Sequence, residues 1–260
     1  MRTETIRPLS GLREQSARRV NPTRFLYLSF ALLLFALVLL GFRQFFLHGR
    51  AVSGQELPPS VRSLLIIHGV AMTGWMALFI IQPLLIVGHN RRLHILLGMF
   101  GTALAALIVV LGTWTAIATT KRIDTDLVRY GLHRRQFMAV PLIDILGFLT
   151  FVGVGIWKRK RPEIHRPMML LGTLAMMAAA TNRIPQFRGL GATNILGHLF
   201  GPHLVPLAIG VLFLATKSVL TRTIDRWFAI GLAASVVVSI LCMQIASSAA
   251  WDRIATALTS

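Results

Sequence analysis

The sequence has very few acidic residues and almost no cysteine. Nine Asp and Glu residues stand against 27 Lys and Arg in a chain of 260, and Cys242 is the single cysteine. One cysteine excludes an intrachain disulfide and a metal site built from several thiolates. The motifs CxxCH, HExxH, GxxxxGK(S/T) and GxSxG are also missing. Their absence argues against covalently bound haem c, a zincin-type protease, P-loop nucleotide chemistry and the commonest serine-hydrolase elbow.

Charged residues of both signs are scarce, whereas apolar residues are abundant. They make up 14% and 55% of the chain, and the mean hydropathy is +0.68. This composition excludes an ordinary water-soluble domain and predicts an all-α, polytopic transmembrane helix bundle. The net charge of +18 comes from short basic clusters between apolar runs. Such clusters favour membrane lipids as partners, with other membrane proteins as further candidates, and argue against nucleic acid.

The apolar runs predict seven membrane spans, because a span needs about 20 mostly apolar residues. They are residues 25–42, 63–87, 95–118, 137–157, 167–181, 195–216 and 227–250. The fifth has the shortest uncharged stretch. Residues 1–24 are predicted to be a basic cytoplasmic segment without the pattern of a cleaved signal peptide. Residues 25–250 then form one transmembrane domain, and residues 251–260 form a short tail.

The distribution of Lys and Arg predicts the orientation. Sixteen of the 27 basic residues flank the spans on the N-terminal side, and the other 11 lie on the opposite side. By the positive-inside rule, the N-terminus is expected in the cytoplasm and the C-terminus in the periplasm of a bacterial inner membrane.

A short pattern occurs twice. Leu93-His94 and Ile164-His165 are each followed, after six residues, by Gly-Thr, and each lies just after a basic turn. The repetition predicts a duplicated helical hairpin, with chance similarity as the alternative. Because residues seven apart share a helix face, each histidine lies above small residues, among them Gly98 and Gly101. This face suits either close packing of a neighbouring helix or a flat haem held by the histidine. The row of small residues by itself favours helix packing.

Other polar side chains interrupt the apolar runs. His68, Trp75 and Gln82 are seven apart and so share a face of the second span, where they form hydrogen bonds between helices or line a site. Asp144 is the only acidic residue well inside a span. It is a candidate proton relay or ion ligand, with His68 or Arg183 as expected partner, or a tie between helices.

Two further histidines flank a Gly-Pro break at the start of the sixth span. His198 and His203 are five residues apart, about 140° around an ideal helix. Only one of them is therefore expected to be a ligand at any single site.

These motifs together support a resemblance. His68-Gly69 with Trp75 and Gln82, then Arg91-Arg92-Leu93-His94 with Gly98, then the run 161–169 resemble a widespread family of uncharacterised bacterial polytopic membrane proteins, classed as a domain of unknown function. The resemblance covers residues 68–182 and implies the fold and the membrane location. Histidines at two membrane levels also look like di-haem transmembrane b-type cytochromes, although no cytochrome motif is present.

Three functions follow as hypotheses. The most specific is electron transfer through haem b, with His94 and His165 as ligands of an inner haem, and His68 with His198 or His203 as ligands of an outer one. The second is a non-catalytic membrane subunit or assembly factor of a larger complex. The third is a small proton- or ion-coupled transporter that uses Asp144 and the polar face of the second span. The sequence contains no hydrolase or transferase motif that would assign an enzyme.

Overall fold

The computed structural model describes residues 22–51, 54, 56–122, 128–191 and 195–260. This part of the chain is mostly helical and contains no strand, only two isolated bridges, Arg50 with Glu56 and Arg129 with Leu132. The predicted all-α class is confirmed. The long helices are α1 (Pro22–Gly41), α3 (Pro59–Val87), α4 (Arg91–Arg122), α6 (Ala139–Trp157), α7 (Pro162–Ala175), α11 (Leu204–Thr221), α12 (Arg226–Ala246) and α13 (Ala249–Thr259). The short ones are α2 (Arg43–His48), α5 (Arg134–Phe137), α8 (Ala178–Thr181), α9 (Pro185–Gly191), α10 (Ile195–Phe200) and the 3₁₀ turn η2 (Gly201–His203).

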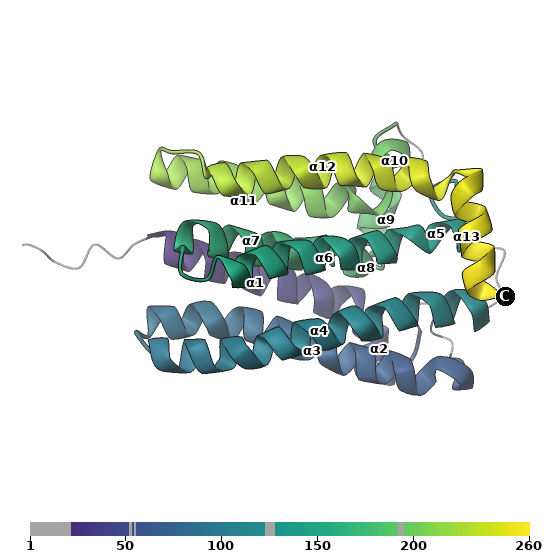
Figure 1. Cartoon of the computed structure of the whole chain (residues 1–260), viewed down its shortest axis with the longest axis horizontal. Coiled ribbons are helices and arrows are strands. Elements are labelled where there is room, and N and C mark those ends of the chain that lie inside the picture. The colour runs from purple at the N-terminus through teal and green to yellow at the C-terminus, as the bar shows by residue number, and fades with distance from the viewer. Residues whose placement is uncertain (1–21, 52–53, 55, 123–127, 192–194) are drawn as a thin grey trace, which may run out of the picture.

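The helices form three antiparallel hairpins, α3–α4, α6–α7 and α11–α12, that lie side by side (Figure 1). Helix α1 packs against α3, α8 and α11. The tight turns of all three hairpins lie at one end of the bundle, which we call the turn end. Helix α13 lies across the other end, which we call the C-terminal end (Figure 1). The predicted basic segment 1–24 falls almost entirely outside the described residues.

Among the described residues, five helical stretches are long and apolar enough to cross a membrane, which fits an integral membrane protein. They are Pro59–Val87, Arg91–Lys121, Arg134–Trp157, Ile195–Thr221 and Arg226–Ala246. The predicted count of seven spans is not confirmed, because the apolar part of α1 is shorter and the fifth predicted span is broken after Ala175. The 14 residues of α7 extend only about 21 Å. Its residues 170–174 are buried by neighbouring helices, so their polar backbone is shielded by protein rather than by lipid.

The last predicted span and the predicted tail differ from the structure. Helix α12 ends at Ala246, and the Ser248 hydroxyl caps a new helix by accepting a hydrogen bond from the Trp251 N–H at 3.2 Å. Residues 251–260, predicted as a tail, thus belong mostly to α13. The Trp251 indole donates to the Gln136 carbonyl at 3.1 Å, and Ala255 is completely buried. Helix α13 therefore closes one end of the bundle.

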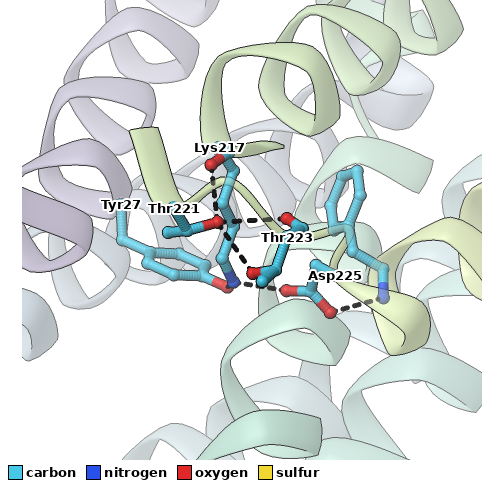
Figure 2. A network of polar contacts seen from close by, with 6 residues as sticks. Tyr27, Lys217, Thr221, Thr223 and Asp225 are labelled. Atoms are coloured by element: carbon cyan, nitrogen blue, oxygen red, sulfur yellow. Dashed lines mark hydrogen bonds and ion pairs between the residues drawn. The ribbon is translucent and has the colours of Figure 1, made fainter. Parts of the chain in front are cut away.

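The turn between α11 and α12 is attached to α1 by a polar network (Figure 2). Lys217 forms an ion pair with Asp225 and donates to the Tyr27 hydroxyl at 3.1 Å. The same aspartate caps α12, since its Oδ1 accepts from the Phe228 N–H at 3.1 Å. Asp225 thus starts α12 and pairs with Lys217, which joins the third hairpin to α1. An N-cap of this kind contributes about 1 kcal/mol.

The α6–α7 hairpin depends on close contact at Gly172. A Cβ placed there would lie 2.6 Å from Val152 Cγ2 and 3.3 Å from the Val152 backbone nitrogen. Gly172→Ala is therefore expected to force the helices apart and to destabilise the protein by about 1–3 kcal/mol. Gly153→Ala is the matched control on α6, because no described atom lies within 4 Å of that position. Thermal unfolding in mild detergent measures both, and equal stability of the two variants would contradict the role of Gly172.

Candidate functional site

Two histidines from different hairpins lie next to each other near the turn end. His94 and His165 are each the fourth residue of their helix, α4 and α7, and both helices begin at the turn end (Figure 1). Their ring centroids are 6.5 Å apart, and the ring planes are nearly perpendicular at 88°. The structure thus brings together the two histidines of the repeated sequence pattern. We call them the histidine pair.

The His165 ring is positioned by the preceding helix of its own hairpin, whereas the His94 ring is not held in this way. The His165 Nδ1 lies 2.8 Å from the Gly155 carbonyl of α6. Because a carbonyl only accepts, Nδ1 carries the hydrogen, and the lone pair remains on Nε2. His94 lies beside the backbone of Gln82 in α3, yet its Nδ1 is buried and makes no hydrogen bond within the described chain. His94 Nδ1 is thus a buried polar atom without a hydrogen-bond partner among the described residues.

Gln82 adds a second unsatisfied atom beside the histidine pair. Its Oε1 is buried and has no hydrogen-bond partner among the residues described. Its Nε2 lies next to Gly98, where a Cβ would be 3.8 Å away. Arg91 and Arg166 are close enough to act electrostatically on His94, and Arg166 also acts on His165. The surroundings of the histidine pair are therefore positive and suit a ligand that carries negative groups.

The glycines below the histidine pair mainly serve helix packing. A Cβ on Gly101 would lie 3.5 Å from Leu78 of α3, and Gly172 contacts α6 as described above. In both hairpins the Gly-Thr glycine faces the helix that precedes it. The contacts at these two glycines therefore match the packing interpretation, and they leave the imidazoles rather than the glycines as the candidate ligand-binding groups.

The polar face of α3 connects two hairpins through Trp75. Its indole Nε1 donates to the Thr173 hydroxyl at 3.2 Å, and both residues are buried. In the other copy of the motif, Thr102 is exposed and donates only to the Gly98 carbonyl at 3.0 Å. The two copies thus have different surroundings, and the predicted duplication of the hairpin is not confirmed.

The repeated threonines provide a matched pair of variants. Thr173→Val is expected to destabilise the protein by about 1–3 kcal/mol, because the buried Trp75 N–H loses its acceptor. Thr102→Val removes an equivalent hydroxyl from an exposed site and is expected to change stability by less than about 0.5 kcal/mol. Chemical unfolding followed by tryptophan fluorescence would measure the difference. A similar decrease in the free energy of unfolding for both variants would rule out a specific role for the hydrogen bond from Trp75 to Thr173.

At the C-terminal end, Asp144 has a partner that differs from the expected one. Its Oδ1 lies 2.7 Å from His203 Nε2, and His203 Nδ1 lies 3.2 Å from the Phe200 carbonyl. Both His203 nitrogens are therefore engaged. His68 instead lies against Gly112 of α4, with its Nδ1 buried and unpartnered in the described structure. His198 is exposed on α10, and the helix of His68 packs mainly on α4 and α1. The structure does not assemble a second such pair of histidines.

The described residues contain no cluster of three or more His, Cys, Asp or Glu side chains able to hold a metal ion. A cleft of about 280 Å³ opens at the C-terminal end, and its lining includes Tyr130, His198 and Met243. No protein family model, curated protein or solved structure matches the chain. The resemblance to a widespread membrane protein family therefore remains an expectation from short motifs.

Proposed function

We propose that this integral membrane protein binds one b-type haem near the turn end, between the α3–α4 and α6–α7 hairpins, and transfers single electrons. His94 and His165 would hold the haem iron. The observation that carries the proposal is the close approach of these two imidazoles, with 6.5 Å between ring centroids.

The spacing fits a shared metal ion. A metal–imidazole bond of about 2.0 Å on each side puts two ring centres roughly 6 Å apart. His165 already has the required tautomer, because Gly155 holds its Nδ1–H and leaves Nε2 for the metal. A zinc site would need further protein ligands, and none joins the pair among the described residues. A haem would bring the remaining metal ligands that two histidines cannot provide.

The surrounding residues have separate tasks. Gly155 orients the His165 ring. Arg91 and Arg166 would neutralise the carboxylates of a bound haem. Iron in such a site supplies one-electron redox chemistry, and its potential depends on the axial ligands and on burial. The excess of basic residues at the turn end supports placing this end at the cytoplasmic face of a bacterial inner membrane.

An outer haem is not part of the proposal. His203 would have to give up Asp144 to bind iron, and His198 is exposed on another helix. No contact in the described chain specifically favours a purely structural subunit or an assembly factor.

Absorption spectra test the proposed function directly. The protein is purified in mild detergent from haem-replete cells, and oxidised and dithionite-reduced spectra are recorded with a pyridine haemochrome assay on the same sample. A sharp reduced α-band with about one haem per chain is expected. A colourless protein would overturn the proposal.

A further inference from the structure

Asp144 and His203 form a buried polar pair that the haem proposal does not use. Each residue is only 8% exposed, and they come from different elements, α6 and η2. The distance between Asp144 Oδ1 and His203 Nε2 is 2.7 Å. The Cys242 thiol of α12 is the other titratable group that interacts with Asp144. Within the described chain, each member of the pair faces no further charged group that acts on it.

The hydrogen bonds of this pair define how many protons it holds. The Phe200 carbonyl only accepts, so His203 Nδ1 must carry a hydrogen. The contact between His203 Nε2 and Asp144 Oδ1 then holds one further proton, bound either to the nitrogen or to the oxygen. The pair therefore shares a proton that either partner can carry.

A small hollow lies beside the turn that carries His203. Gly201 and Pro202, the two residues before His203, line this hollow with Tyr130, Thr181 and Asn182. Its volume of about 10 Å³ is near the minimum for one water molecule. The larger open cleft of about 280 Å³ includes Tyr130, His198, Gln244 and Ser247 in its lining. Tyr130 is therefore shared by the cleft and the hollow.

Tyr130 is suited to pass a proton between these spaces. Its hydroxyl donates to the Asn182 side chain. Burial raises the pKa of Tyr130, so the hydroxyl remains a donor at neutral pH. The backbone of Gly201, next to the hollow, has a left-handed φ of 51° and packs against Met243, which also lines the cleft. The hollow thus adjoins a turn whose left-handed backbone suits glycine.

We propose that Asp144 and His203 form a proton-binding site that exchanges protons with the aqueous phase at the C-terminal end, through the hollow beside Tyr130. Burying a carboxylate within a membrane span is energetically costly, so such residues usually serve a function. Binding and release of a proton is a function that explains why an ionisable pair is kept here. This inference does not depend on haem, because its ligand is the proton alone.

Hydrogen exchange at the His203 ring tests the site. The full chain is labelled with ¹⁵N-histidine and purified in detergent, and the ring N–H signals are followed after transfer into D₂O. The His203 signal is assigned with His203→Gln or, should that variant not fold, by elimination with alanine variants of the other histidines. We expect the wild-type signal to exchange at least about tenfold faster than backbone amides of the neighbouring core of α6.

Tyrosine variants test the route. Tyr130→Phe keeps the ring but removes the hydroxyl, and it is expected to slow exchange at His203 about tenfold. Tyr27→Phe is the matched control, since that hydroxyl lies in the network of Figure 2 at the opposite end of the bundle. Exchange as slow as in the core amides would overturn the proton site, and an equal rate in Tyr130→Phe and wild type would overturn the proposed route.

Discussion

Replacing His165 with alanine is expected to abolish the reduced α-band of the purified protein, and His94→Ala is expected to have the same effect. Each variant removes one of only two protein ligands that we assign to the iron, and the two ring centroids are 6.5 Å apart. With either histidine removed, a non-covalently bound haem would keep only one protein ligand. The measurement is the reduced-minus-oxidised spectrum, normalised by the pyridine haemochrome content per chain.

Exposed histidines provide the control for this experiment. His48→Ala on α2 and His198→Ala on α10 alter exposed imidazoles outside the pair, so haem content is expected to stay at the wild-type value. Haem that persists in both His94→Ala and His165→Ala would show that these residues are not the ligands. Equal loss in all four variants would instead point to a general defect in folding.

Removing His203 is expected to cause the largest loss of stability. His203→Ala leaves the Asp144 carboxylate buried without its partner, and breaking a buried pair in this way costs about 3–5 kcal/mol. The double variant Asp144→Leu/His203→Leu removes both polar groups and is expected to recover most of that loss, since an apolar replacement of a buried pair is often close to neutral.

Chemical unfolding of the purified protein measures these changes in free energy. His198→Ala is the matched control, because this histidine is exposed close by in sequence, and its substitution is expected to change stability by less than about 0.5 kcal/mol. Two results would contradict the role assigned to the pair. One is that His203→Ala lowers the free energy of unfolding by no more than His198→Ala does. The other is that the double variant is less stable than His203→Ala.

Composition and apolar patterning were sufficient to predict the helical class and most helix positions. The five stretches that meet the length and apolarity of a span all overlap predicted spans. The pattern failed at the fifth span, where Met176 and Met177 continue the apolar run although α7 ends at Ala175. An apolar run indicates that the side chains avoid water. It does not distinguish side chains buried within the protein from side chains exposed to lipid.

The choice of partner for Asp144 shows a second limit. His68 was expected at a similar depth, but depth along a span does not say which helices are neighbours. The structure places η2 beside α12, α8 and α10, and its turn at Gly201 aims His203 at Asp144. A Gly-Pro break signals that the chain changes direction, but its new direction depends on packing.

The sequence by itself determined the helical architecture, the membrane character and the position of His94 and His165 near the starts of their helices, because these follow from local apolarity and from short spacing. Only the tertiary structure decided that these two rings lie next to each other, that His203 rather than His68 holds Asp144, and that residues 249–259 close the bundle. These contacts join residues 59 to 115 positions apart. Such contacts depend on how whole helices pack, which no local pattern encodes.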